Sequence, residues 1–434
     1  MFRPQSPGRA RLRCVCALTL ASTLFATGCS MSRLRPQLAE LGRFAQFGGR
    51  VVGVEAETRV IAVLIAGTGA SASIANYAFA HRDGRYLLLG RSGALRVLGF
   101  ADRDADAVLD ADEPVGWVTV PEVVEGGAMT RLELGDLRLS PTAERPGFAV
   151  DLSVIGAAGQ QARARRLGEV VSLDDPRFAP EVVSRGVWEP LRFAEESGLQ
   201  ILFTEPYDPA RTPVVFVHGM QGSPRDFREL VAGLDRTRFQ AWVYYYPTGI
   251  DLVVNGLVLR ELLGELRHRL GFERLHVVAH SMGGLVSLSA ILGAAAEGAD
   301  LGIDRFVTIS TPWQGAVGTR GMRAGLAITP TTAPSWTDML PESGFLEQLE
   351  AQAVPPGVHF SLIFGFAGSN AMVSGADDGT VAVRSMAAWS MIQQAEYVLP
   401  VAADHEGILR DAAVAAAVAR LLRGEPPTDG AARR

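Results

Sequence analysis

The C-terminal half of the chain alternates two hydrophobic patterns. From residue 213 onward, short continuous apolar runs are separated by segments whose apolar residues recur every three or four positions. Continuous runs are typical of strands buried on both faces, and the longer period is typical of helices. The apolar runs lie at 214–217, 241–246, 275–279, 306–309 and 360–366, and helical segments at 225–234 and 259–270. This alternation predicts an α/β fold class, a doubly wound, mostly parallel sheet with helices on both faces.

Residues 49–140 follow a different pattern. Strand-like runs alternate there with turn dipeptides such as Asp83-Gly84, and they lie at 58–65, 86–89, 95–100, 117–120 and 130–134. Short strands with frequent turns predict a small all-β sandwich domain ahead of the α/β domain. The segment from Tyr86 to Asp102 resembles the transthyretin-like, or prealbumin-like, sandwich modules of secreted bacterial proteins. We expect residues 141–204 to be a linker that packs against the second domain.

The N-terminus has the pattern of an export signal. Four arginines precede residue 14 without an acidic residue, and an apolar run then covers 14–26. This run is too short to span a bilayer comfortably, so it predicts a secretory signal peptide over 1–28. It ends in Ala26-Thr27-Gly28-Cys29, which resembles the bacterial lipobox, with alanine where leucine is usual. The resemblance implies lipid attachment at Cys29, a polar tether over 29–48 and, because Ser30 is not aspartate, an outer-membrane location.

Composition agrees with this interpretation. The 434 residues suffice for two or three domains, and the other two cysteines, Cys14 and Cys16, lie inside the signal. The mature protein would therefore contain no disulfide, although export permits one. The alternative is an ordinary cleaved signal in which Cys29 only stands near the cut. A net charge of −6 without a basic cluster argues against nucleic-acid binding, and the lipid would supply the membrane attachment.

An acidic loop in the β-rich region has the spacing of a calcium site. Oxygen donors counted from its first aspartate follow the EF-hand loop pattern. The predicted ligands are Asp102, Asp104, Asp106, the carbonyl of Val108, Asp110 and Glu113. The loop departs from the pattern because Ala107 replaces the usual glycine and strands, not helices, flank it. We predict a structural, non-catalytic calcium ion, and the alternative is a solvated acidic turn.

One apolar run leads into Ala279-His280-Ser281-Met282-Gly283. This sequence places a serine at a tight turn between a strand and a helix, where small neighbours are needed. It resembles the G-x-S-x-G nucleophile elbow of α/β hydrolases, with alanine in the first position as in some bacterial lipases. A serine hydroxyl is a weak nucleophile near neutral pH, so this interpretation requires a base.

Chain order identifies the partners of Ser281. The fold places nucleophile, acid and histidine in that order, and only His359 and His405 of the seven histidines follow Ser281. His359 begins a predicted strand, at the end away from the active-site edge, which leaves His405 as the base. The acid should follow the strand at 360–366. The hydrolase pattern G-x-x-D-x-x-V at 375–381 selects Asp378, with Asp377 as the alternate.

A loop at 217–222 resembles the H-G-x-x-G loop of lipases and esterases. An oxyanion hole needs two backbone N–H groups, and we expect them from Met220 and Met282. We interpret His218 as a packing residue. Together, residues 205–423 resemble the α/β-hydrolase superfamily, specifically its lipase/esterase-like bacterial members. The resemblance implies cleavage of carboxylic esters through an acyl-serine intermediate, without a cofactor.

The segment between 311 and 349 bears on the substrate. Its large apolar residues would line an acyl pocket or a mobile cap, or else pack an ordinary cap helix. They are Trp313, Met322, Trp336, Met339 and Phe345. With a membrane anchor, they favour a lipid-like or acyl-ester substrate. The alternatives are an acyltransferase on the same scaffold and a tethered, non-catalytic binding protein, and thioesterase, amidase or peptidase activity stays open. We expect the polar tail at 424–434 to be disordered.

Overall fold

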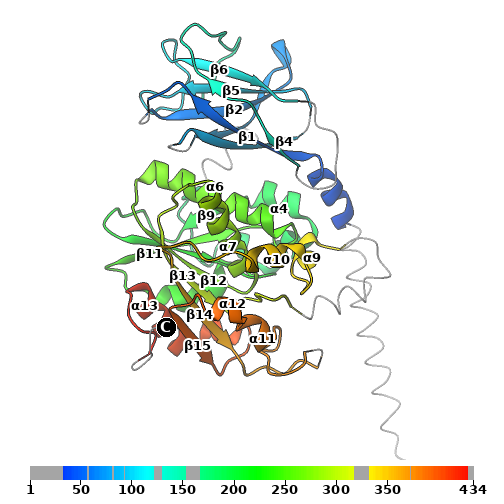
Figure 1. Cartoon of the computed structure of the whole chain (residues 1–434), viewed down its shortest axis with the longest axis vertical. Helices are drawn as coiled ribbons and strands as arrows, with labels where there is room; N and C mark the ends of the chain where they lie inside the picture. Colours follow the sequence, from blue (N-terminus) through cyan, green and yellow to red (C-terminus); the bar gives the residue numbers. More distant parts are fainter. Residues whose placement is uncertain are drawn as a thin grey trace, which may run out of the picture.

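The computed structural model places an all-β domain over an α/β domain (Figure 1). It describes residues 33–55, 58–80, 83–91, 93–121, 130–152, 167–316, 332–371 and 373–428. The predicted signal peptide and Cys29 lie outside these residues. Among the helices in the described ranges, none is long and apolar enough to cross a membrane.

The all-β domain consists of two four-stranded sheets. The first contains β1 (Phe44–Val52) between β4 (Arg85–Arg91) and β7 (Thr130–Glu133), with β8 (Leu137–Arg138) also on β1. The second runs in the order β3 (Ser73–Phe79), β2 (Val60–Ala66), β5 (Leu95–Ala101) and β6 (Val115–Thr119). Phe47, Leu64 and Val97 are fully buried in the core that the two sheets share. The prediction of an all-β region ahead of the α/β domain is confirmed.

The predicted tether at 29–48 extends too far. Residues 33–41 are helical, and β1 already begins at Phe44. The sequence pattern missed this strand because two central glycines interrupt its apolar alternation, and it missed β3 because no residue of that strand is fully buried. Burial of Phe47 between the sheets makes β1 part of the domain.

The α/β domain has a seven-stranded sheet in the order β15-β14-β13-β12-β10-β11-β9. All neighbouring strands are parallel except β9, which pairs antiparallel with β11 at one edge. The predicted fold class is therefore confirmed. The strands are β9 (Gln200–Phe203), β10 (Thr212–Val217), β11 (Phe239–Tyr245), β12 (Leu275–His280), β13 (Ile303–Ile309), β14 (His359–Gly365) and β15 (Tyr397–Val401).

Helices cover both faces of this sheet. Strand β10 shows why, because Val215 and Val217 enter one apolar core while Val214 and Phe216 enter the other. The first core contains residues of α6 (Leu252–Leu270), α7 (Met282–Ala296), α9 (Pro334–Asp338), α10 (Gly344–Glu350), α11 (Val383–Met386) and α12 (Trp389–Ile392). The second contains residues of α4 (Pro190–Glu196), α5 (Arg228–Ala232) and α13 (Ala412–Leu422). Helix α3 (Pro180–Trp188) contributes to the first core through Val187.

Two further boundaries differ from prediction. The α/β domain begins before residue 205, because β9 belongs to its sheet and Phe193 and Leu202 are buried in its core. The predicted linker thus contains part of the domain. The predicted disordered tail also starts too early, since Arg420 donates a hydrogen bond to the Pro426 carbonyl at 2.6 Å. Residues 429–434 lie outside the described ranges.

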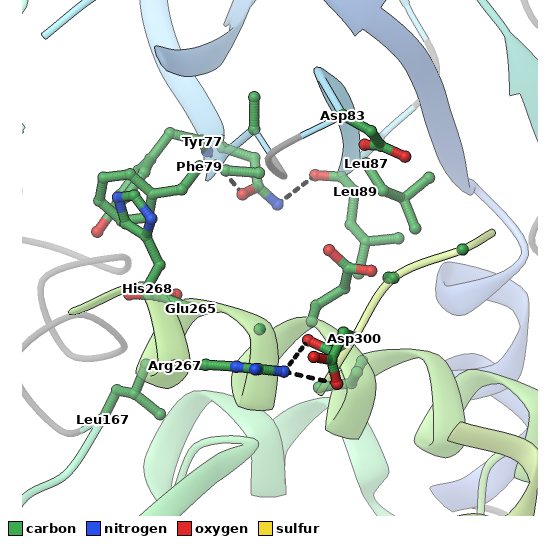
Figure 2. A pocket seen from close by; sticks show the side chains of 18 of the residues that line it. Tyr77, Phe79, Asp83, Leu87, Leu89, Leu167, Glu265, Arg267, His268 and Asp300 are labelled. Atoms are coloured by element: carbon green, nitrogen blue, oxygen red, sulfur yellow. Dashed lines mark hydrogen bonds and ion pairs between the residues drawn. The ribbon is translucent and has the colours of Figure 1, made fainter. Parts of the chain in front are cut away.

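The sandwich lies against α6 of the second domain. Phe79 stacks on His268 with ring centroids 5.6 Å apart, and Arg131 forms an ion pair with Glu297 at 3.0 Å. Between the domains is a cavity of about 340 Å³. Figure 2 shows Tyr77 and Leu89 on its sandwich side and Arg267 of α6 on the other. Because Ser281 does not line this cavity, it belongs to the domain interface and not to the predicted active site.

Candidate active site

Ser281 occupies a sharp turn between β12 and α7. Its backbone has φ 52° and ψ −128°, a conformation that costs a non-glycine residue about 1–3 kcal/mol and persists only where its surroundings hold it. The Ser281 N–H donates to the Ile309 carbonyl on the neighbouring strand at 2.8 Å, and its own carbonyl accepts from Gly284 N–H at 3.0 Å. The turn therefore presents the hydroxyl at the carboxyl edge of the sheet, as in a nucleophile elbow.

This position lies where the strand order reverses. Strand β10 has β11 on one side and β12 on the other, and the chain reaches β12 only after crossing by α6. In open α/β sheets, ligands bind in the crevice outside the strand ends at such a reversal. Ser281 follows β12 and Met220 follows β10, so both residues lie at the edge of the sheet where the strand order reverses.

Two glycines allow the elbow and the β10 loop to approach each other. A Cβ on Gly219 would lie 2.9 Å from the Ser281 Cβ and 3.3 Å from His280 Nδ1. A Cβ on Gly283 would collide with the backbone carbonyl oxygens of Val217 and His218. Because glycine has no side chain, the start of α7 can pack directly against the end of β10.

The Gly283→Ala substitution is expected to destabilise the protein by about 1–3 kcal/mol, because backbone atoms cannot move aside as a flexible side chain does. Urea unfolding of the protein without its predicted signal peptide (residues 1–28), here called the leaderless protein, measures this change. Gly293→Ala, on the same helix, is the control because its new Cβ would meet mainly the end of the Arg260 side chain. Equal stability of the two variants would contradict the close approach described above.

The structure brings Ser281, His405 and Asp378 together. His405 Nε2 lies 2.9 Å from the Ser281 hydroxyl oxygen, and His405 Nδ1 lies 2.6 Å from Asp378 Oδ2. The Asp378 side chain is fully buried, whereas 11% of the His405 side chain is exposed. The histidine can therefore accept the serine proton at one ring nitrogen while the carboxylate fixes the other as a donor.

Asp378, not its neighbour Asp377, is the carboxylate that reaches the histidine. Burial would raise the pKa of Asp378, but the hydrogen bond from His405 and its charge, with the N–H groups of Val381 and Thr380, hold that pKa below its usual value. Asp377 instead accepts hydrogen bonds from the N–H groups of Gly379 at 2.7 Å and Asn370 at 3.3 Å. It shapes the loop that carries Asp378.

Comparison with known families adds to this geometry. Residues 211–337 match the family model described as "Putative serine esterase (DUF676)". The matched segment begins near β10 and includes Ser281, and the other two residues follow it in the order acid, then histidine. The sheet order and the elbow fit the same assignment. The second domain has the α/β-hydrolase fold.

Solved structures are similar to part of the chain. Mature lipase BlEst2 of Bacillus licheniformis is 20% identical over 48% of this chain and 92% of that chain, with a TM-score of 0.39. For Aspergillus fumigatus lipase B, the identity is 16%, the coverage 55% of this chain and 57% of that chain, and the TM-score 0.40. Phospholipase PlaB of Legionella pneumophila is 14% identical over 41% of this chain and 44% of that chain, with a TM-score of 0.34. No curated protein matches the chain.

The predicted oxyanion residues lie at the same edge of the sheet as Ser281. Met282 is the first residue of α7, so helix geometry leaves its N–H without an i−4 carbonyl. The neighbouring loop is held in place because the Tyr246 hydroxyl donates to the His218 carbonyl at 2.6 Å and Gln221 N–H donates to the Thr248 hydroxyl at 3.4 Å. These contacts fix the loop on either side of Met220.

Three other histidines of the second domain differ in what their side chains contact. His218 stacks on Tyr246, and burial lowers its pKa to about 4, consistent with packing. His359 bonds Glu396 at 2.6 Å at the start of β14, away from the carboxyl edge of the sheet. His280 received no role from the sequence, yet its ring centroid lies 4.8 Å from that of His405. No motif spacing signals this contact.

The apolar residues of the predicted cap mostly pack the hydrolase core. Trp336 meets Trp188 edge-on at 5.3 Å, and Trp313 meets Phe360 edge-on at 6.0 Å. Four of the five named residues are buried in the core on the α6 face: Trp313, Trp336, Met339 and Phe345. Packing is therefore the interpretation that fits these four. Met322 lies outside the described residues.

The acidic loop of the sandwich brings three of the six predicted calcium ligands together. Carboxylate oxygens of Asp102, Asp104 and Asp106 lie within 4.8 Å of one another. Ala107 adopts φ 62° at the position where the pattern has glycine. Asp102 also forms an ion pair with Arg59 at 2.8 Å, and Glu113 accepts from the Arg103 N–H at 2.6 Å. The oxygen donors suit a hard cation such as calcium.

If calcium binds here, millimolar CaCl₂ is expected to raise the thermal midpoint of the sandwich, because a ligand that binds only the folded state stabilises it. Differential scanning calorimetry with CaCl₂ and with EGTA measures the shift. Asp104→Asn should abolish it, while Asp112→Asn removes the same charge from a position outside the predicted ligand set. A shift of equal size in both variants would indicate a general charge effect and no site.

Proposed function

We propose that the protein is a serine hydrolase that cleaves carboxylic esters. The observation that carries this proposal is the continuous hydrogen-bonded set of Ser281, His405 and Asp378 at the carboxyl edge of the sheet. The strained backbone of Ser281 and the partial match to a serine esterase family support it. In this proposal Ser281 is the nucleophile, His405 the general base and Asp378 the acid that orients it.

Acylation begins when His405 Nε2 removes the proton from the Ser281 hydroxyl. The serine oxygen attacks the ester carbonyl carbon, and the N–H groups of Met220 and Met282 stabilise the resulting oxyanion. Asp378 stabilises the imidazolium without accepting its proton. Collapse of the tetrahedral intermediate breaks the ester C–O bond, and the alcohol leaves with the proton from His405.

Deacylation repeats these steps with water. His405 takes a proton from water, the hydroxide attacks the acyl-serine carbonyl, and the Ser281 oxygen leaves and recovers the proton. The products are a carboxylic acid and an alcohol, and the proposed chemistry uses no cofactor. An acyltransferase would follow the same first half but would replace water with another alcohol.

Hydrolysis of p-nitrophenyl esters from acetate to palmitate by the leaderless protein tests the proposal. We expect turnover, together with stoichiometric labelling of Ser281 by a fluorophosphonate probe located by peptide mass spectrometry. Preference for long chains would identify a lipase-like enzyme, and preference for short chains an esterase. Labelling without hydrolysis, with acyl transfer to added alcohols, would favour the acyltransferase. The absence of both labelling and turnover would contradict the proposal.

We further propose that a lipid on Cys29 anchors the protein to the bacterial envelope, at the outer membrane. The support is the N-terminal sequence and the docking of the helix that follows it. Leu34 is fully buried in the hydrolase core, and Gln37 Oε1 accepts hydrogen bonds from Leu191 N–H at 3.0 Å and Arg192 N–H at 3.3 Å. The anchor would thus hold the hydrolase domain near acyl-ester lipids of the bilayer.

Cys29→Ala is expected to move the protein from the membrane to the soluble fraction, because the single attachment point for lipid is lost. Fractionation of cells expressing the full chain, followed by immunoblotting, measures this. Ser30→Asp is the matched variant: it should stay membrane-bound but shift towards the inner membrane in a density gradient. Retention of Cys29→Ala in the membrane would contradict the lipid anchor.

A further inference from the structure

His280 is a buried titratable residue that the proposed mechanism leaves unused. It ends strand β12, directly before Ser281, and is only 7% exposed. Its Nε2 lies 2.9 Å from the backbone carbonyl oxygen of His405. Two residues that are 125 positions apart thus join the nucleophile elbow to the loop of the base.

The hydrogen bond defines the state of the His280 ring. A carbonyl oxygen only accepts, so the proton of this bond must sit on Nε2. Burial first, and then the nearby His405, lower the pKa of His280 to about 3. The ring is therefore neutral at physiological pH and remains a donor without placing a second positive charge beside the imidazolium of His405 during turnover.

The backbone of His405 is held from two sides. Its N–H donates to the Asp378 carbonyl at 2.8 Å, and its carbonyl accepts the bond from His280. The acid loop therefore fixes one side of the peptide and the elbow strand fixes the other. The side-chain bonds of His405 to Asp378 and Ser281 then follow from a backbone whose position both elements define.

We propose that His280 is a positioning residue that holds the His405 loop so that Nε2 of His405 stays in hydrogen-bond reach of the Ser281 hydroxyl. The inference rests on the proposed serine-hydrolase function. His280 touches neither the substrate nor the reacting atoms in this scheme, and it acts through the His405 carbonyl. Losing it would displace the base, and a displacement of about 1 Å lowers the rate by on the order of 10²-fold.

Two substitutions separate the hydrogen bond from packing. His280→Leu removes the donor but keeps an apolar side chain in the buried site. His280→Gln retains an amide N–H that can reach the same carbonyl. His276→Gln is the matched control, because His276 is also buried on β12 but faces Asp304 at 3.6 Å instead of His405.

We expect His280→Leu to lower kcat for p-nitrophenyl ester hydrolysis 10- to 100-fold with KM unchanged within about twofold, because the base and not substrate binding is disturbed. His280→Gln should recover most of kcat, and His276→Gln should keep the wild-type kcat. Wild-type kcat in His280→Leu would overturn the inference. So would an equal loss in the leucine and glutamine variants, since the donor would then make no difference.

A second readout does not need turnover. The proton shared by His405 Nδ1 and Asp378 should give a far-downfield proton NMR resonance, present in wild type and His280→Gln and broadened or lost in His280→Leu. An unchanged resonance in His280→Leu would also overturn the inference. Wild-type protein that shows this resonance but neither hydrolyses esters nor reacts with a fluorophosphonate would instead contradict the proposed function.

Discussion

Alanine in place of Ser281 should lower kcat for p-nitrophenyl ester hydrolysis by on the order of 10⁶-fold, leaving only the background from binding and the oxyanion hole. The reason is that His405 Nε2, 2.9 Å from the serine oxygen, then has no nucleophile to activate. No acyl intermediate can form on the chain. Stopped-flow and steady-state assays of the leaderless protein measure both the burst and the turnover.

The matched control for this loss is Ser287→Ala. Ser287 is also a buried serine of the same region, on α7, but its hydroxyl donates to the Gly283 carbonyl at 2.7 Å instead of to a histidine. It should keep kcat within about threefold of wild type. Hydrolysis that survives in Ser281→Ala would exclude Ser281 as the nucleophile, whatever the control does.

Asp378→Asn should lower kcat by about 10⁴-fold while leaving the fold intact. The asparagine is the same size, but it cannot stabilise the imidazolium electrostatically, and its amide favours the wrong tautomer of His405. Because the pKa of Asp378 lies below its usual value, the wild-type carboxylate is ionised throughout the neutral range. The deficit should therefore persist from pH 6 to pH 8 in a pH–rate profile.

Asp377→Asn decides between the two neighbouring carboxylates. Its oxygens accept hydrogen bonds only from loop N–H groups in the described structure, at Gly379 and Asn370. The amide oxygen can still accept the shorter bond from Gly379 N–H, and the substitution loses only the 3.3 Å bond from Asn370 N–H, so we expect less than about a tenfold loss in kcat. If instead Asp377→Asn lost 10⁴-fold and Asp378→Asn did not, the assignment of the acid would be reversed.

Local sequence pattern was sufficient for most of the fold. Strands β10 to β14 each contain a short apolar run, because a parallel sheet covered on both faces places most of its side chains in an apolar core. Strand β15 was not predicted. Its residues are apolar, but Pro400 interrupts the run, and proline within a sheet is confined to edge strands such as this one. Strand β9, at the opposite edge, was not predicted because it is only four residues long.

The residues of the candidate site were likewise predicted in part from the sequence and decided in part by the structure. The sequence alone predicted Ser281 and His405, which the structure brings together. The elbow is a contiguous motif whose small residues are required by a strained turn, and chain order leaves only two histidines after Ser281. It also predicted that the acid lies at 377 or 378. Adjacent residues on a loop point in different directions, so only the position of a histidine 27 residues away decided for Asp378.

Tertiary structure also decided what no spacing encodes. The contact of His280 with His405 joins the end of strand β12 to the loop of His405, and the domain boundaries depend on which core Phe47 and Phe193 enter. The large apolar residues of the insert could not be assigned to a pocket or to packing until their neighbours were known. Sequence patterns show which residue types a turn or a strand requires locally. Which residues contact each other across the molecule depends on which distant segments the completed fold brings together.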